Sequence, residues 1–228
     1  MSKRPEHSDA FLSSFGRRKG RRLLPRKQDL METLLPSISL DPTQGFTPFD
    51  DARPLHLEIG FGAGEHLAAR AASQPDVGFI GCEPFINGVA KLLVKIAERE
   101  LTNIRLFTDD VRLLLPCIPD GAIEQVYILF PDPWPKLRHH KRRLVSHTLL
   151  AELARIQPVG GKLLLATDHV DYSRWMLSHI QSSPHYEWTA ECAADWKTPP
   201  QGWVATKYQT KTTKEGREPV FIHCVKKA

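Results

Sequence analysis

One carboxylate and three glycines stand close together near residue 60, in the stretch EIGFGAGEH. Glu58 precedes Gly60, Gly62 and Gly64, between an expected strand and an expected helix. Glycine lets the backbone approach a ligand closely, and the start of a helix leaves N–H groups unpaired. A dinucleotide-binding loop would have glycine at position 65, where this chain has Glu65. The Glu58 carboxylate would repel a pyrophosphate but attract an ammonium group, and S-adenosylmethionine carries both an ammonium and a sulfonium.

Two further acids follow the next two expected strands. Glu83 ends the second strand, at the place where a carboxylate usually holds a ribose diol. Asp110 ends the third strand, where it can accept a hydrogen bond from an adenine amine, and Asp109 is the alternative. This ordered set of acids and glycines favours S-adenosylmethionine over a nicotinamide or flavin cofactor.

A third group of candidate residues lies in FPDPWPKLRHHKRR, at 130–143. Asp132 stands between two prolines after the expected fourth strand, at the edge that borders the ligand crevice in open α/β sheets. Because proline fixes φ, this carboxylate has little freedom to turn away. Trp134 either stacks on a flat substrate or packs inside, and packing is the more common role. We predict that Asp132 is catalytic and also borders the cofactor.

The segment that follows this loop is strongly basic. Residues 136–143 include five Lys/Arg, two histidines and no acid. A solvated surface normally mixes both signs of charge, so this segment suits a phosphate backbone. The chain has a net charge of +5, of which residues 1–27 carry +7 and the remainder −2. A basic arm beside a near-neutral body suits a polyanionic partner, and a merely solvated tail is the alternative.

Several other classes of site are disfavoured. The four cysteines are widely separated and His139 and His140 are adjacent, so neither a disulfide framework nor a metal site is expected. No apolar run approaches the ~18 residues that a membrane-spanning helix needs, and the N-terminal segment lacks the apolar core of a secretory signal. We therefore expect a cytoplasmic protein without membrane contact, either a monomer or a weak homodimer.

Strand-like and helix-like patterns alternate five times from residue 55 onward. The expected strands are short, continuous apolar runs at 55–62, 77–83, 104–110, 123–132 and 162–168. Helical spacing follows them at 65–74, 87–100, 111–118, 145–157 and 170–183. Continuous apolar strands are covered on both faces, so the pattern predicts a doubly wound, parallel α/β sheet.

The last third of the chain changes character. Residues 202–211 and 218–227 are expected to form an antiparallel hairpin at the edge of the sheet. A doubly wound sheet with a C-terminal antiparallel hairpin is the architecture of class I S-adenosylmethionine-dependent methyltransferases. We divide the chain into a basic N-terminal arm, 1–28, and a single domain, 29–228.

Several of these motifs together resemble a known family, the bacterial tRNA (guanine-N7)-methyltransferases. The resemblance rests on EIGFGAG, FPDPWPKLRHHKRR, ATD at 166–168, TKYQTK at 206–211 and the arm SFGRRKGR at 14–21. It implies transfer of a methyl group from S-adenosylmethionine to N7 of a guanine in the variable loop of tRNA. The family usually has glutamate in its T-x-Y-E-x-K motif, where this chain has Gln209.

The resemblance also assigns roles to positions. The residues that match the family's cofactor and active-site acids are Glu58, Glu83, Asp110 and Asp132. Those that match its substrate-binding positions are Lys136, Asp168, Thr206, Lys207, Tyr208 and Gln209. Its RNA-contact stretch corresponds to 138–143, which includes Arg138, Lys141, Arg142 and Arg143.

Guanine N7 is an in-plane lone pair without a proton, so its methylation needs positioning more than a base. Asp132 or Asp168 can accept from the N1–H and N2–H₂ groups on the opposite edge of the base, and nearby carboxylates stabilise the positive charge that develops. Reaching N7 requires the base to leave its stack. Two alternatives remain at this stage: a methyltransferase for another nucleic-acid or protein substrate, and a catalytically silent RNA-binding module.

Overall fold

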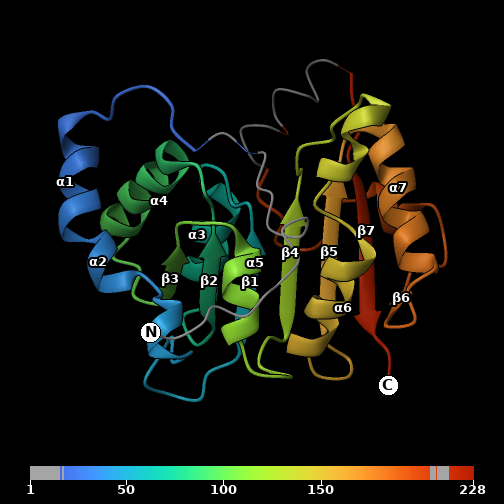
Figure 1. The fold of residues 1–228 in the computed structure, drawn as a ribbon, viewed down its shortest axis with the longest axis horizontal. Coiled ribbons are helices and arrows are strands. Elements are labelled where there is room, and N and C mark those ends of the chain that lie inside the picture. The colour runs from blue at the N-terminus through green and yellow to red at the C-terminus, as the bar shows by residue number, and fades with distance from the viewer. Residues whose placement is uncertain (1–15, 17, 206–208, 210–215) are drawn as a thin grey trace, which may run out of the picture.

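The computed structural model describes residues 16, 18–205, 209 and 216–228, and places a seven-stranded sheet at the centre of the molecule (Figure 1). The strand order is β3-β2-β1-β4-β5-β7-β6. The strands are β1 (Leu55–Ile59), β2 (Gly78–Cys82), β3 (Ile104–Phe107), β4 (Gln125–Leu129), β5 (Lys162–Thr167), β6 (Tyr186–Trp188) and β7 (Val220–Lys226). The first five are parallel, and β7 runs antiparallel to both β5 and β6. The chain order reverses between β1 and β4, so a ligand crevice is expected outside the carboxyl ends of these two strands.

Helices cover both faces of the sheet. The described helices are α1 (Pro25–Thr33), α2 (Leu35–Ile38), α3 (Glu65–Ser73), α4 (Ile86–Glu98), α5 (Val111–Leu114), α6 (His147–Ile156), α7 (Val170–Gln181) and α8 (Ala194–Lys197). Short 3-10 turns occur at η1 (Pro42–Gln44), η2 (Leu115–Cys117) and η3 (Leu137–Arg142). Each expected strand and major helix from 55 to 183 is present, so the predicted doubly wound α/β fold is confirmed.

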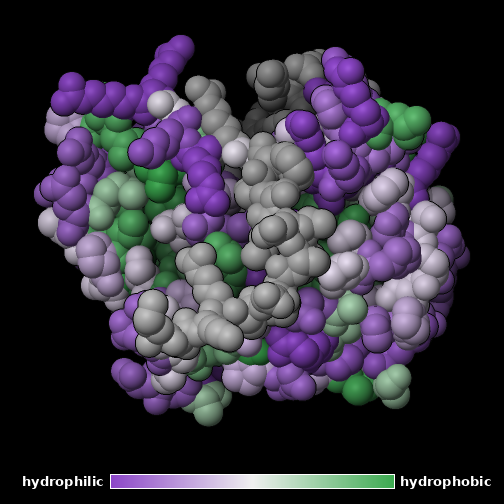
Figure 2. Space-filling view, viewed as in Figure 1, coloured by the Kyte–Doolittle hydropathy of each residue, from purple (hydrophilic) through white to green (hydrophobic). Residues whose placement is uncertain are grey.

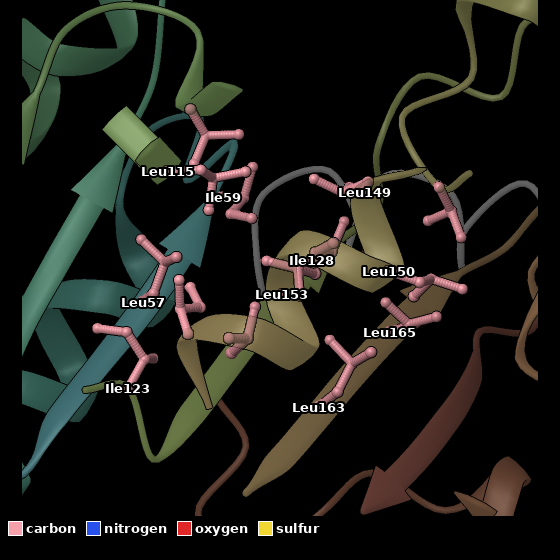
Figure 3. Close-up of a cluster of buried hydrophobic side chains, with 14 of the residues drawn as sticks. Leu57, Ile59, Leu115, Ile123, Ile128, Leu149, Leu150, Leu153, Leu163 and Leu165 are labelled. Carbon is pink, nitrogen blue, oxygen red and sulfur yellow. The ribbon is translucent and has the colours of Figure 1, made fainter. Parts of the chain in front are cut away.

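The larger apolar core lies between the sheet and α6. Alternate residues of neighbouring strands, such as Leu57, Ile128 and Leu165, point to this face, where Leu150 and Leu153 of α6 meet them (Figure 3). All five side chains are fully buried. At ~25 cal/mol per Å² of apolar surface, each contributes roughly 1.5–3 kcal/mol to stability relative to an exposed side chain.

The opposite face is covered unevenly. Residues of α3 and α4 pack on the part of the sheet formed by β2 and β3. Over β4, β5 and β7, Phe130 and Trp203 pack on Tyr127 and Phe221. A cavity of about 340 Å³ lies between this cluster and α3, and its lining includes Gln125 and Tyr127 of β4. Gln125 begins β4, so the cavity lies away from the carboxyl ends of the parallel strands.

The C-terminal antiparallel pair differs in detail from the expectation. β7 lies where a strand is predicted, but its antiparallel partner beyond β5 is the three-residue β6 rather than 202–211. The described residues of that segment, 202–205 and 209, are not in a strand, and the rest lie outside the described structure. Trp203 packs its ring edge-on against Phe221, so it lies on a face of the sheet instead of extending its edge.

The N-terminal segment is in contact with the domain. The backbone N–H of Gly20 donates to Asn87 Oδ1 at 2.7 Å, and Asn87 Nδ2 donates to the Arg21 carbonyl at 2.6 Å. α1 begins at Pro25, four residues before the expected domain boundary, and Arg26 pairs with Glu98 of α4 at 3.0 Å. The division at residue 28 therefore stays a prediction. Within the described residues, no helix is long and apolar enough to span a membrane.

Candidate active site

Five carboxylates come together at one edge of the sheet. Parallel strands bring their carboxyl ends to the same side, and Glu58, Glu83, Asp110, Asp132 and Asp168 lie in or just after the five parallel strands. Burial raises the pKa of Glu83, and the nearby charges of Asp132 and Glu58 act in the same direction. The parallel topology therefore places the predicted acids at the edge where open α/β sheets bind their ligands.

The glycine loop has the conformation that its sequence suggests. Gly60, Gly62 and Gly64 have φ values of 74°, 57° and 70°, in the left-handed region that favours glycine. A Cβ on Gly60 or Gly62 would meet no heavy atom of the described residues within 4 Å, so both face open space. The loop also needs a glycine in α4, because a Cβ on Gly88 would lie 2.2 Å from the Gly62 carbonyl oxygen.

Glu83 fixes this loop. Its Oε2 accepts from the Gly62 N–H at 2.7 Å and its Oε1 accepts from the Phe85 N–H at 2.9 Å. Burial raises the pKa of Glu83, while these two hydrogen bonds oppose the rise. Each carboxylate oxygen retains a second lone pair for a ligand hydroxyl.

Glu58 has a partner that the sequence pattern does not indicate. Its Oε2 lies 2.7 Å from Nδ1 of His66, and both side chains are buried. His66 lies in the first turn of α3 and also contacts the rings of Tyr127 and Trp203. The eight-residue spacing across a tight turn gives no periodic signal, so the pair becomes evident only once the turn is known.

The two acids after β3 have separate partners. Asp110 is the N-cap of α5, and Arg112 binds both of its oxygens, with Nη2 at 2.5 Å from Oδ2. Asp109 lies 2.6 Å from Arg18 of the arm and accepts from the Asp110 N–H. The arm therefore reaches the edge of the crevice next to the position predicted to hold an adenine.

The loop after β4 is sharply bent. Phe130 and Trp134 have φ values of 52° and 42°. Non-glycine residues avoid this region at a cost of roughly 1–2 kcal/mol each, and each of the two precedes a proline, which disfavours the right-handed alternative. Asp132 lies exposed between them. Strained residues cluster at functional sites, which agrees with the role predicted for this loop.

Trp134 packs within the protein. The guanidinium of Arg142 lies 5.0 Å from the centre of its ring, and His139 meets it edge-on at 5.9 Å. Packing, one of the two roles considered for this residue, is thus present in the structure. The cation–π contact also holds η3 against the loop that carries Asp132.

The predicted basic residues divide into two kinds. Lys136, just before η3, and Arg138 and Lys141 on η3 are exposed, and Arg142 is half-buried. Figure 2 shows strongly hydrophilic side chains at the top of the view, over η3. The side chain of Arg143, in contrast, is only 1% exposed. It binds within the protein, which does not match the solvent-facing position expected of a phosphate ligand.

The remaining predicted substrate residues lie beyond β5 and near the C-terminus. Asp168 is buried, and Arg217 Nη1 lies 3.1 Å from its Oδ2. Gln209 is 8% exposed and accepts from Trp203 Nε1 at 2.7 Å. Thr206, Lys207 and Tyr208 lie outside the described residues. The neutral amide at 209 thus has a defined acceptor role that does not require charge.

Comparison with known proteins agrees with this arrangement. Residues 52–222 match a family model described as "Putative methyltransferase". A tRNA (guanine-N(7)-)-methyltransferase of Agrobacterium fabrum is 44% identical, over 99% of this chain and 98% of the relative. One of Rhodospirillum rubrum is 42% identical, over 97% and 89%.

Solved structures show the same fold at low identity. The 16S rRNA methyltransferase KamB aligns with a TM-score of 0.58 and 16% identity, over 79% of this chain and 93% of that one. An rRNA methylase from Streptococcus thermophilus gives 0.52 and 13%, over 78% and 89%. The fold is therefore that of the class I methyltransferases, and the full-length similarity to curated relatives shows that the chain belongs to the tRNA (guanine-N7)-methyltransferase family.

Proposed function

We propose that this protein transfers a methyl group from S-adenosylmethionine to N7 of a guanine in the variable loop of tRNA. The strongest support for this function is that a predicted cofactor loop and a basic surface lie at the same edge of the sheet. A glycine loop ringed by carboxylates faces open space, and the Asp132 loop continues directly into the exposed basic surface of η3. Relatives that span nearly the whole chain carry the name of this activity.

The residues of the crevice fit the cofactor. Bare backbone at Gly60 and Gly62 leaves room for a ligand to lie against the loop. Glu58 would attract the ammonium group, and Glu83 would accept from the ribose hydroxyls through its remaining lone pairs. Asp110 would accept from the adenine amine alongside its contacts with Arg112. When bound, S-adenosylmethionine supplies a methyl group on a positively charged sulfur.

The protein's part in the reaction is positioning and electrostatics. N7 needs no general base, so the site must hold the guanine in line with the transferred methyl group. An exposed carboxylate at Asp132, fixed between prolines, can accept from the guanine N1–H and N2–H₂ groups and oppose the positive charge that appears on the purine. Asp168 is the alternative acceptor for these guanine N–H groups, and its ion pair with Arg217 would have to rearrange for that role.

The exposed residues Lys136, Arg138 and Lys141 would contact tRNA phosphates, together with the basic arm. The arm is well placed for this, because Arg18 reaches Asp109 at the rim of the crevice. A tRNA held on both sides of the crevice would have its flipped base directed at Asp132.

Nucleoside analysis tests the proposal. The protein is incubated with methyl-labelled S-adenosylmethionine and bulk tRNA, and the digested RNA is separated. We expect label in 7-methylguanosine only. Label in another nucleoside, or in protein added instead of tRNA, would support the alternative of a methyltransferase with a different substrate. No transfer with intact tRNA binding would leave an RNA-binding module.

A further inference from the structure

The last arginine of the basic segment differs from its neighbours in where its side chain lies. Arg138 and Lys141 point to solvent, whereas the Arg143 side chain is 1% exposed. A charge buried this completely needs partners inside the protein, because an unpaired buried ion is costly. Its partners therefore show what the residue does.

Arg143 connects two separate elements. Its Nε donates to the Pro133 carbonyl at 2.9 Å, which lies in the loop that carries Asp132. Its Nη2 donates to Asp171 in the first turn of α7. The same guanidinium lies 5.1 Å from the ring centre of Tyr172 and 5.0 Å from that of Trp175, also on α7.

The first turn of α7 leads straight back to the other candidate acid. α7 begins two residues after Asp168, and its N-cap is fixed by two hydrogen bonds. The His169 N–H donates to Thr167 Oγ1 at 3.2 Å, and the Tyr172 N–H donates to His169 Nδ1 at 3.3 Å. The junction that carries Asp168 is therefore continuous with the surface that holds Arg143.

We propose that Arg143 is a positioning residue that braces the Asp132 loop against the β5–α7 junction, and that it is not a phosphate ligand. It fixes the separation of Asp132 and Asp168, the two candidate acceptors for the guanine edge. The inference deepens the proposed function and rests on it, because the separation of Asp132 and Asp168 matters for catalysis only if a guanine binds there. The brace itself is a property of the folded protein, independent of the substrate.

The chemistry of the side chain explains why arginine is needed. A planar guanidinium donates in two fixed directions and stacks on aromatic rings, so one group can hold a carbonyl, a carboxylate and two ring faces. An ammonium is a point charge on a flexible chain, so lysine can keep Asp171 or the Pro133 carbonyl but not the whole set. The loop needs such support because Phe130 and Trp134 are strained.

The test compares Arg143→Met, Arg143→Lys and Asp171→Asn with the control Arg174→Met, which replaces an exposed arginine of α7. Single-turnover methylation, the salt dependence of tRNA binding, hydrogen exchange of the peptide spanning 129–136 and thermal melting are measured for each. We expect Arg143→Met to lower the methylation rate about 10²-fold, as a loss of alignment does, and to speed exchange in the loop. The methylation rate of Arg143→Lys should lie between those of Arg143→Met and the wild type. Asp171→Asn should also lower the rate.

The tRNA-binding measurement separates the brace from a phosphate contact. With the brace, the slope of log affinity against log salt stays at the wild-type value in Arg143→Met. A phosphate ligand at 143 would reduce that slope by roughly 0.7–0.9, and Asp171→Asn would then retain the wild-type rate. Either result overturns the proposal. If Arg143→Met does not fold, Arg143→Lys and Asp171→Asn decide by the same criteria. A wild type that methylates no tRNA would refute the proposed function, while loop exchange would still report on the brace.

Discussion

The two halves of the crevice are built differently. On the side of β1 and β2, Glu58 and Glu83 are buried, and each already has a hydrogen-bonding partner within the protein. On the side beyond β4, Asp132 and most of the basic residues of η3 are exposed. A small cofactor of fixed shape favours a preorganised pocket, whereas a large polyanion is bound by exposed charge that it can reach without dehydrating a buried site.

This contrast implies that the two kinds of binding can be disrupted separately. Changes at the glycine loop should abolish cofactor binding and spare tRNA affinity, and changes on η3 should do the reverse. Only residues at the boundary between the two halves should change the methylation rate without changing the affinity for cofactor or tRNA.

The largest effect is expected at Gly62. Gly62→Val places a side chain in the open space where the loop faces the cofactor, and φ of 57° adds strain. Titration calorimetry should detect no binding of S-adenosylhomocysteine, while tRNA affinity persists.

Gly160→Val is the matched control for this change. Gly160 also has a positive φ, of 82°, with no described heavy atom within 4 Å of an added Cβ, but it lies in the turn before β5. The Gly160→Val variant should lose a similar amount of stability and should bind S-adenosylhomocysteine with the wild-type affinity. Unchanged affinity in Gly62→Val would remove this loop from the cofactor site.

A smaller effect is expected on the substrate side. Replacing Lys136, Arg138 and Lys141 with alanine should weaken tRNA binding, and each lost phosphate contact should lower the log–log salt slope by roughly 0.7–0.9. Affinity for S-adenosylhomocysteine should not change. A control that replaces Arg99 and Lys162, both exposed at the opposite edge of the sheet, should keep the slope. A full slope in the triple variant would mean that η3 is ordinary solvated surface.

Stability should also fall in acid, because of a histidine near the amino end of β1. Burial, with Arg70 and Lys162 nearby, lowers the pKa of His56 in β1 to about 4 from its ordinary value of 6.5. The folded state thus binds fewer protons than the unfolded state between these values, so stability is present above pH 6.5 and is lost as pH falls toward 4. The loss should be about 3 kcal/mol.

Chemical denaturation across this pH range checks the prediction. His56→Phe should flatten the dependence, because phenylalanine has no proton to bind. His147→Gln, at the exposed first residue of α6, is the control for the loss of one histidine. A wild-type protein equally stable at pH 4.5 and 6.5 would contradict the assignment to His56.

The fold was largely predictable from the sequence because its signals are local. Five apolar runs and the amphipathic helices between them specify a parallel sheet, and topology alone then brings the acids at the strand ends to one edge. β6 escaped prediction because three residues carry too little pattern. The pattern predicts a strand at 202–211, in which Trp203 and Val204 suit a strand, although Trp203 packs on a sheet face instead.

The site was predictable in its residue types but not in its pairings. The motif shows five basic residues in 136–143, and nothing in that spacing indicates that Arg143 turns inward while Arg138 turns outward. The same holds for His66 behind Glu58 and for Arg18 beside Asp109. These contacts join segments far apart in the chain or across a sharp turn, so they depend on tertiary packing.

The two halves are expected to meet at Asp132, and single-turnover methylation of tRNA by Asp132→Asn is the direct test. Asparagine keeps the size and one acceptor oxygen but removes the charge. We expect the methylation rate to fall roughly 10²-fold or more, in line with the loss of one preorganised electrostatic contact. Melting temperature, cofactor affinity and tRNA affinity should stay close to the wild type. A stable variant with a near wild-type rate would contradict the claim and transfer the role to Asp168.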